Sequence, residues 1–311
     1  MQSPSYDVVV IGGGAAGLSA ALVLGRARRT VALVDAGSPR NAPATHMQGY
    51  LSRDGMPPTE LLAVGRAEVA SYGVELIDGS VTGVEPGFTV RLGDGRELTA
   101  RRLLVSTGIS DELPDIPGVR ERWGRDLLHC PYCHGWEVRD QPLGVIGSVA
   151  GSAQHALLVR QWSDDVVYFD HDGELGGDKR DQLVARDIGI VDGPIRRLVV
   201  EDDRLTGIEL ADGRQVARSA VFVRPEWVPH PDGLLPSLGC ELDGAGFPVV
   251  DGTGRTSVSG VWAAGNAADP RAQVITAAGQ GSAAAIAINA DLVIDDVAGA
   301  LAQQRASSNR S

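Results

Sequence analysis

Two of the three cysteines stand three residues apart in the run HCPYCHG, from His129 to Gly135, with a histidine on each side. Such a pair can cycle between a dithiol and a disulfide. When the second cysteine lies in a first helical turn, the unpaired backbone N–H groups favour its thiolate, and a neighbouring histidine can take or return the proton. The run therefore predicts redox chemistry, with Cys130, Cys133 and His134 as the catalytic residues.

Three other interpretations of the cysteine pair are weaker. C-x-x-C-H is also the attachment pattern of c-type haem, but that attachment belongs to exported proteins, and we find no export signal. A structural zinc site wants four ligands, normally with a second pair at similar spacing, whereas Cys240 stands alone. An inert buried pair stays open as the third alternative. A redox-active disulfide is favoured, and no metal site is expected.

Composition narrows the class of protein. A chain of 311 residues with 43% hydrophobic residues predicts a globular protein of two domains. The net charge of -12 argues against nucleic acid and anionic membranes as partners, and no apolar run reaches the roughly 18 to 20 residues of a spanning helix. The N-terminus lacks a basic, cleavable apolar segment. We expect a cytoplasmic protein that acts on small molecules.

The chain opens with a pattern typical of dinucleotide binding. The apolar strand Tyr6 to Ile11 leads into Gly12 to Gly17, a full G-x-G-x-x-G. Its glycines allow, in turn, the tight turn, the approach of a pyrophosphate to the backbone, and close helix packing. A helix to about Gly25 and a strand from Thr30 to Val34 then deliver Asp35, an acid suited to the ribose hydroxyls. The cofactor-binding residues of the turn are expected to be Gly12, Gly14, Ala15, Ala16 and Gly17.

The loop from Gly37 to Pro58 is rich in Pro, Gly, Asn and His. Such a composition marks an ordered functional loop more often than a linker. It can cover a flavin ring, so Asn41 and His46 are cofactor candidates. A lone histidine is nevertheless more often a satisfied surface residue.

A helix from Thr59 to Tyr72, with a Thr cap, and several short strands should follow. The strands are expected at Val74–Val81, Phe88–Leu92, Glu97–Ala100 and Leu103–Ser106. Gly93 to Gly95 turns the hairpin between two of them. Val81 at a strand end, and Thr107 with Gly108 after the last strand, are further cofactor candidates.

The same pattern then repeats. A strand from Leu143 to Ile146, a turn from Gly147 to Ser152, a helix from Ala153 to Trp162 and a strand from Val166 to Phe169 lead to Asp170. Its distance from the first glycine of the turn equals that in the first copy. We infer two dinucleotide-type modules, with the cysteine pair where the second one begins.

The second module departs from the nucleotide-binding pattern. Val149 stands where the middle glycine should be, and Ser152 replaces the third glycine. Asp170 to Asp172 follow the strand where the 2'-phosphate of NADPH would need arginines. The last strand of this module ends in Arg224-Pro225 instead of Thr-Gly. Together these changes predict a module that keeps the fold without binding nicotinamide.

The C-terminal segment returns to the first module. Gly260 to Asn266 reads as a short strand into a glycine turn, and Gln273 to Gly281 opens a long helix of small residues. The N-terminus of that helix can set its dipole against a flavin pyrimidine. As an alternative, an alanine-rich helix is simply a good helix. The cofactor candidates here are Gly265, Asn266, Gln273 and Val274.

The order of these motifs resembles the low-molecular-weight thioredoxin reductases over nearly the whole chain. Members of that family are homodimeric FAD enzymes with a nicotinamide domain inserted into a discontinuous FAD domain. The resemblance implies an α/β fold of two Rossmann-like modules, the second inserted into the first. It implies an FAD-binding domain of residues 1–114 and 232–311, and a central NAD(P)-like domain of residues 115–231 that carries the cysteine pair.

Two positions depart from that family. Where it commonly has Asp after the second cysteine and at the end of its Ala-Ala-Gly turn, this chain has His134 and Asn266. It also lacks the family's arginine-bearing NADPH segment. These departures resemble the FAD-dependent dithiol oxidases that close disulfides in natural products of the gliotoxin, holomycin and romidepsin types.

The resemblance implies a mechanism in which a small dithiol attacks Cys130, the outer sulfur. Cys133 then donates electrons to FAD, His134 shuttles the proton, and oxygen reoxidises the flavin to give hydrogen peroxide. An NAD(P)H-dependent reductase of thioredoxin or a low-molecular-weight disulfide is the first alternative, because Asp170 suits NADH. A flavin-binding protein with a structural disulfide and no turnover is the second.

Overall fold

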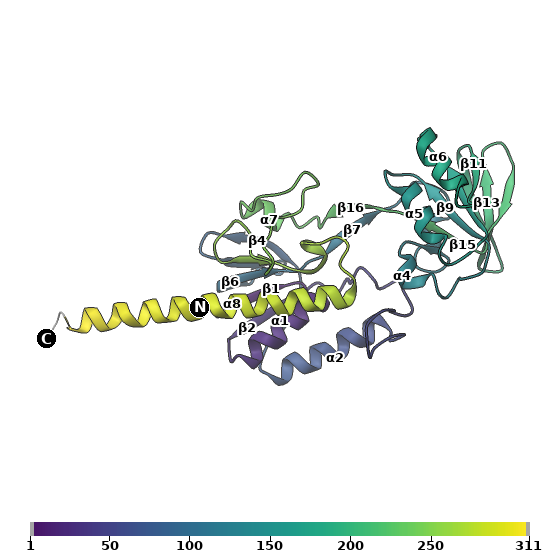
Figure 1. Ribbon diagram of the computed structural model, residues 1–311. Coiled ribbons are helices and arrows are strands. Elements are labelled where there is room, and N and C mark those ends of the chain that lie inside the picture. Colours follow the sequence, from purple (N-terminus) through teal and green to yellow (C-terminus); the bar gives the residue numbers. More distant parts are fainter. Residues whose placement is uncertain (1–2, 309–311) are drawn as a thin grey trace. The chain divides into compact units, whose positions relative to one another are not determined.

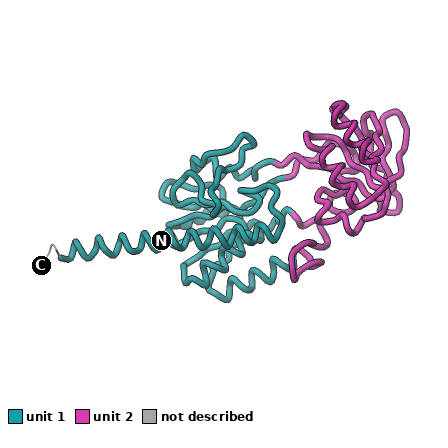
Figure 2. The backbone as a smooth tube through the Cα atoms, in the orientation of Figure 1, with its two compact units in different colours: residues 1–40, 59–110, 228–311 teal, residues 41–58, 111–227 magenta. Residues whose placement is uncertain are grey.

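The computed structural model describes residues 3–308. They form two compact units, shown in different colours in Figure 2. The first unit comprises the described residues up to Arg40, Thr59–Ser110 and those from Val228 onward, and the second comprises Asn41–Pro58 and Asp111–Trp227.

The first unit is built on a sheet whose strand order is β3-β2-β1-β6-β5-β4, with β17 also paired to β6. Strands β1, β2, β3 and the end of β6 run parallel, whereas β4 and β5 add an antiparallel meander. The strands are β1 (Ser5–Ile11), β2 (Val31–Asp35), β3 (Glu75–Asp78), β4 (Val81–Glu85), β5 (Thr89–Leu92), β6 (Glu97–Val105) and β17 (Val261–Ala263).

Helices α1 (Ala15–Arg26) and α8 (Val274–Ser308) lie side by side against this sheet (Figure 1). Their small residues let the two backbones approach closely, and the apolar layer that they share with β1 and β2 includes the fully buried Val8, Val10 and Leu33. A second apolar layer includes Val9 and Val105, together with Leu234 and Leu235 of α7 (Leu234–Ser237). The strand β1 is therefore buried on both faces, as expected of a parallel strand in an α/β fold.

The second unit repeats the arrangement in the order β11-β10-β9-β15-β8, with every pairing parallel. Here β9 lies between β10 and β15, just as β1 lies between β2 and β6. Its sheet strands are β8 (Leu127–Leu128), β9 (Leu143–Gly147), β10 (Val166–Asp170), β11 (Gly189–Asp192) and β15 (Ala220–Val223). An antiparallel meander is formed by β12 (Ile195–Glu201), β13 (Arg204–Leu210) and β14 (Gln215–Ala217). The predicted fold class of two Rossmann-like modules is confirmed.

Short helices complete the two units. In the second unit they are α3 (Val119–Arg122), α4 (Pro131–His134), α5 (Ser152–Val159) and α6 (Gly177–Val184). In the first unit, α2 (Pro58–Ser71) precedes β3, and η1 (Gly265–Ala267) follows β17. The chain passes between the units through β7 (Ile109–Glu112) and β16 (Glu226–Pro229), which pair as a two-stranded sheet. The boundaries expected at 114 and 231 lie just past these strands. Within the described residues, no helix has the length and hydropathy to cross a membrane.

Several expected elements differ from the structure. The strand expected from Val74 to Val81 is broken at Gly79, which has a φ of 152°, so that β3 pairs with β2 and β4 pairs with β5. The two strands expected within 97–106 are the single strand β6. The helix α2 begins at Pro58, because proline suits a first helical turn, so Thr59 is not its cap. The helix α5 ends at Val159, earlier than expected.

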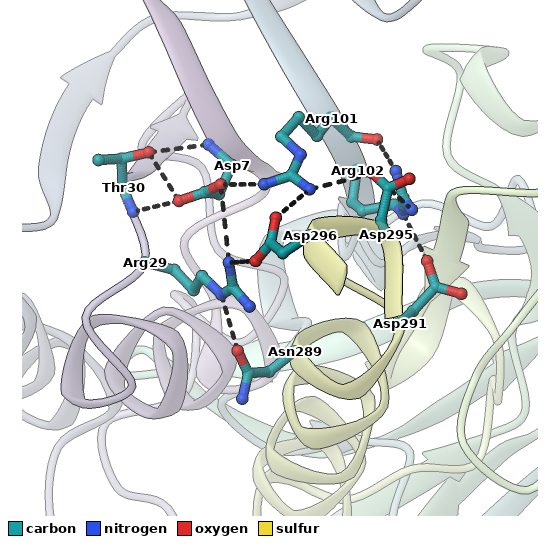
Figure 3. A network of polar contacts seen from close by, with 9 residues as sticks. All are labelled: Asp7, Arg29, Thr30, Arg101, Arg102, Asn289, Asp291, Asp295 and Asp296. Atoms are coloured by element: carbon teal, nitrogen blue, oxygen red, sulfur yellow. Dashed lines mark hydrogen bonds and ion pairs between the residues drawn. The ribbon is translucent and has the colours of Figure 1, made fainter. Parts of the chain in front are cut away.

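An ion-pair network fastens α8 to the sheet (Figure 3). Arg101 of β6 donates to Asp7 at 2.9 Å and to Asp296 at 2.6 Å. Arg29 donates to Asp296 at 2.8 Å, and Arg102 donates to Asp291 at 2.6 Å. Burial acts to raise the pKa of Asp7, but hydrogen bonds from Thr30 and Arg101 and the charge of Arg29 lower it on balance. The last buried residue of α8 is Leu292. Around and beyond this position, ion pairs instead of apolar contacts join α8 to the sheet.

Replacing Arg101 by glutamine should lower the free energy of unfolding in urea by about 1–3 kcal/mol at neutral pH, because Asp7 and Asp296 lose a charged donor. The lowered pKa of Asp7 means that its stabilising effect is present above the unfolded value of about 3.9 and is lost as the pH falls below it. The difference between the parent and Arg101→Gln should therefore shrink in acid. Arg91→Gln, at an exposed pair with Glu85, is the control and should change little. Equal unfolding midpoints for the parent and Arg101→Gln would contradict a stabilising role.

Candidate active site

The cysteine pair lies at the start of α4. Cys130 is the N-cap in an extended conformation, Pro131 is the first helical residue, and Cys133 lies in the first turn. The two cysteines form a disulfide with a Cα–Cα distance of 5.2 Å, and the backbone N–H of Cys133 donates to Cys130 Sγ at 3.2 Å. Because the unpaired N–H groups of a helix start favour negative charge, this geometry stabilises a thiolate when the disulfide opens.

The two flanking histidines have different environments. Burial lowers the pKa of His134 below its ordinary value of 6.5, and the charge of Glu137 opposes this. His134 is therefore neutral at physiological pH and able to accept a proton. The ring of His129 instead packs against His155 and Trp227, with centroid distances of 5.6 and 5.5 Å. Of the two, only His134 combines a neutral imidazole with a place in the helix of Cys133.

Two aromatic residues that were not predicted as site residues, Tyr132 and Trp136, lie close to the disulfide in the sequence. Tyr132 is 63% exposed and Trp136 is 66% exposed, although both are large and partly apolar. Tyr132 contacts Trp162 edge-on at 5.5 Å, and the guanidinium of Arg139 lies 3.9 Å from the Trp136 ring centroid. Two large rings are therefore exposed within three residues of Cys133. Their spacing of four residues around the second cysteine was the available sequence signal.

The dinucleotide turn of the first unit lies between β1 and α1, at the point where the strand order reverses. A Cβ on Gly12 would come within 2.4 Å of the Ser106 carbonyl oxygen, and one on Gly17 within 1.9 Å of the Gly12 carbonyl oxygen. A Cβ on Gly14 would meet nothing within 4 Å. The first and third glycines are thus required by the fold, whereas the second keeps space open at the N-terminus of α1. An open backbone at a helix start is what a pyrophosphate needs.

Asp35 ends β2 directly beside this turn. Its carboxylate accepts the backbone N–H groups of Gly13 and Gly37, both at 3.3 Å, and lies 3.3 Å from the guanidinium of Arg66. Arg66 also donates to Asp78 at 2.6 Å. The side chain of Asp35 is 21% exposed, which leaves it accessible to ribose hydroxyls. The sequence predicted the acid but not Arg66, which comes from α2 and has no motif of its own.

The first turn of α1 packs against α8. A Cβ on Gly281, in α8, would lie 2.0 Å from the Ala16 carbonyl oxygen, and one on Gly265 would lie 2.9 Å from Ala16 Cβ. The Gln273 carbonyl accepts the N–H of Ala277 at 2.8 Å, so α8 starts where the sequence placed it. The structure therefore places the candidates Gly12, Gly14, Ala15, Ala16, Gly17 and Gly265 in one region, and Gln273 and Val274 at the start of the helix that packs on it.

Asn266 has a definite structural task. Its amide Nδ2 donates to the carbonyls of Asp269, Pro270 and Ala272 at 3.1, 3.3 and 2.9 Å. Its Oδ1 accepts from Arg40 at 3.4 Å. A carboxylate cannot donate these bonds, which explains the amide at this position. Asn266 thus shapes the loop that leads into α8.

Three cofactor candidates are placed less directly. Asn41 and His46 belong to the segment that clusters with the second unit, not with the FAD-type unit where the sequence placed them. The backbone of this segment packs tightly there, because a Cβ on Gly124 would lie 2.8 Å from Pro43 Cβ. Val81 begins the edge strand β4 and pairs with Leu92.

The second dinucleotide turn carries side chains that the first one lacks. The hydroxyl of Ser152 donates to the Val149 carbonyl at 2.8 Å, and the guanidinium of Arg224 lies 2.1 Å from where a Cβ on Gly151 would stand. The turn, from Gly147 to Ala153, lines a cavity of about 360 Å³, whose charged lining residues are Asp170, Asp172, Glu174 and Lys179. Arg180 lies 3.6 Å from Asp170 and also pairs with Asp192. Three acids against one lining cation disfavour the 2'-phosphate of NADPH.

The fold and this site define a class of enzyme. The chain belongs to the pyridine nucleotide-disulphide oxidoreductase family, whose model matches residues 6–281. Its relatives include thioredoxin reductase sirT of Leptosphaeria maculans, which is 33% identical over 94% of this chain and 96% of the relative. These matches confirm the resemblance to thioredoxin reductase-like flavoproteins that the motif order indicated.

Solved structures agree with the family assignment. The crystal structure of HlmI is similar with a TM-score of 0.94 and 61% identity, covering 96% of each chain. A putative thioredoxin reductase TrxB from Bacillus anthracis is similar with a TM-score of 0.88 and 37% identity, covering 93% of this chain and 99% of that one. The family consists of FAD-binding flavoproteins, and this chain is an FAD-dependent oxidoreductase. The open backbone at Gly14 and the accessible Asp35 fit FAD in the first unit.

Gly14→Val should abolish FAD loading, because its side chain would fill the space that the open backbone leaves for the pyrophosphate. The absence of neighbours within 4 Å of the added Cβ means that the fold itself should tolerate the change. Released flavin is quantified by absorbance, and folding by circular dichroism. Gly299→Val, at an equally open glycine of α8, is the control and should load FAD normally. Normal loading of Gly14→Val would contradict the placement of the pyrophosphate.

Proposed function

We propose that this protein is an FAD-dependent dithiol oxidase that closes a disulfide in a small-molecule dithiol and passes the electrons to oxygen, giving hydrogen peroxide. The observation that carries the proposal is the second module. Its turn is bonded internally by Ser152, Arg224 lies against Gly151, and the cavity that the turn lines is mainly acidic. This charge disfavours NADPH as the electron donor, which supports electron entry at the cysteine pair.

The chain's own residues supply the thiol chemistry. A substrate thiol loses its proton to His134 and attacks Cys130 Sγ, and Cys133 leaves as a thiolate. The second substrate thiol then loses its proton to solvent and attacks the substrate sulfur bound to Cys130, whose Sγ leaves as a thiolate that accepts the backbone N–H of Cys133. The product leaves with its disulfide closed, and both cysteines are reduced. The Cys130–Cys133 disulfide then re-forms with loss of two electrons. FAD, held at Gly14 and Asp35, would supply the chemistry that accepts these electrons and passes them to oxygen.

The environment of the cysteines supports a small apolar substrate. The exposed rings of Tyr132 and Trp136 flank the disulfide and suit a compact organic dithiol. We further propose a cytoplasmic homodimer, in line with the resemblance to low-molecular-weight thioredoxin reductases.

A nicotinamide-dependent disulfide reductase is the second candidate. Two observations favour it. A cavity is present at the second dinucleotide turn, and Asp170, the last residue of β10, suits the ribose of NADH. The relatives' own designation as thioredoxin reductases points the same way. The two candidates differ in where the electrons enter.

Mutating each cysteine separately should assign their roles. With FAD bound, Cys130→Ser should leave Cys133 as a thiolate beside the flavin and give a long-wavelength charge-transfer band in the absorbance spectrum. Cys133→Ser should lack that band, and both variants should lose turnover. The reverse pattern would exchange the two roles. Full activity in both variants would reduce the disulfide to a structural element.

Adding electron donors separately under anaerobic conditions should locate the entry point. A dithiol should bleach the flavin absorbance, whereas NADH and NADPH should do so slowly or not at all. In air, the dithiol should drive oxygen uptake with peroxide release, abolished by Cys130→Ser and lowered about 100-fold by His134→Ala, because the attacking thiol loses its base. Rapid bleaching by micromolar NADH or NADPH with little dithiol-driven oxygen uptake would reject the oxidase and favour the reductase.

A further inference from the structure

A histidine and a carboxylate that the proposed mechanism does not use are paired in the FAD-binding unit, between β16 and α7. His230 Nδ1 lies 2.8 Å from Asp232 Oδ2, and the backbone N–H of Leu234 donates to Asp232 Oδ1 at 3.0 Å. The Asp232 side chain is 13% exposed and that of His230 is 40% exposed. The Asp232 carboxylate is therefore mostly buried, and the His230 imidazole is more exposed to solvent.

This pair is linked to the end of β6. The hydroxyl of Thr107 forms a hydrogen bond that acts on Asp232. Thr107 directly follows Ser106, whose hydroxyl donates to the carbonyls of Ile11 and Gly12, both at 3.0 Å. The strands β1 and β6 are neighbours at the point where the strand order reverses, and dinucleotides bind at the carboxyl ends of strands at such a point. Through Thr107, Asp232 is thus linked to the strand end where a dinucleotide of the first unit would bind, and His230 is linked to it through Asp232.

The carboxylate keeps its charge despite its burial. Burial acts to raise the pKa of Asp232, but hydrogen bonds from His230, the Leu234 backbone and Thr107 lower it on balance. A buried carboxylate needs a donor, and the donors here come from its own segment and from β6. When Nδ1–H of His230 points at this carboxylate, Nε2 is the ring atom left to take up or release a proton.

We propose that His230, oriented by Asp232, is a proton-exchanging group of the FAD crevice that serves the transfer of electrons to oxygen. This inference rests on the proposed function, because it takes oxygen as the acceptor. Reduction of oxygen to hydrogen peroxide takes up two electrons and two protons. Bound FAD, once reduced, would supply the two electrons and one proton, and the His230 imidazolium would supply the second proton. The imidazole then regains its proton from solvent. A cation at this place also favours the negative charge that develops on oxygen, and Asp232 acts as a positioning residue.

Photoreduction of bound FAD with light and EDTA tests this step alone, because it delivers electrons without the cysteines or a dithiol. The photoreduced enzyme is mixed with aerated buffer between about pH 5 and about pH 9, across the range in which an imidazole titrates. The parent should reoxidise faster at low pH, where His230 is protonated. In His230→Gln, reoxidation at low pH should be about 10-fold slower or more and nearly independent of pH. Asp232→Asn should flatten the pH profile in the same direction.

A second readout needs no turnover. In the resting, oxidised enzyme, flavin absorbance and fluorescence should show a transition with pH in the parent that is absent from His230→Gln. Asp243→Asn is the matched control, because Asp243 also accepts backbone N–H groups of its own loop, from Ala245 and Phe247, both at 2.9 Å. This control should behave as the parent in both measurements.

The possible failures are distinguishable. Photoreduced parent enzyme that stays reduced in air would reject oxygen as the acceptor, and with it both the proposed function and this inference. Fast reoxidation of the parent with the same rate and pH profile in His230→Gln would overturn this inference alone. Loss of FAD from His230→Gln, with Asp232→Asn unchanged in its pH profile, would overturn it as well, because the residue would then serve cofactor retention.

Discussion

The first unit depends on backbone contacts that a side chain would block. Gly17 places α1 against the carbonyl of Gly12, and Gly281 places α8 against the carbonyl of Ala16. These two contacts hold α1 on the turn that follows β1, and α8 on α1. The anion-binding region at the start of α1 is therefore a consequence of packing, because the absent Cβ atoms that let these elements meet also fix the direction of the unpaired N–H groups there.

The two units show how one fold can be kept while its chemistry is changed. Both place a parallel strand between a second strand on one side and the last strand of the module on the other. In the first unit the turn after that strand is open at Gly14. In the second, Ser152 ties the turn to Val149, and Arg224 covers Gly151. The sheet requires only apolar strands, so the turn was free to diverge without loss of the core.

The sequence predicted what local patterns determine. The two strand–turn–helix–strand repeats, the acid at the end of β2, the start of α8 and the helical place of Cys133 all follow from spacing and glycine chemistry. The break at Gly79 was missed, because a single glycine inside an apolar run is compatible with either a continuous strand or a kink. The kink is established only by the pairing of β3 with β2 and of β4 with β5. Likewise Arg66 and the link from Thr107 to Asp232 join residues far apart in the chain, and no local pattern encodes such contacts.

The place of Asn41 and His46 shows a second limit. Their loop composition predicted a functional loop, which stays a prediction, and it did not indicate which unit the segment joins. The segment packs on the second unit through Pro43, which lies against Gly124. Gly124 has a left-handed φ of 78°, a conformation that the sequence alone does not reveal.

Asn266 changes how one substitution between relatives should be understood. Its amide hydrogens are shared among three carbonyl oxygens of a single loop, so exchanging it for the family's more common aspartate would set a negative charge against three lone pairs. The loop from Asp269 to Ala272 therefore keeps its conformation in this chain only while residue 266 can donate. An aspartate at this position would oblige the three carbonyls to turn toward other donors, so the loop would have to change together with the side chain.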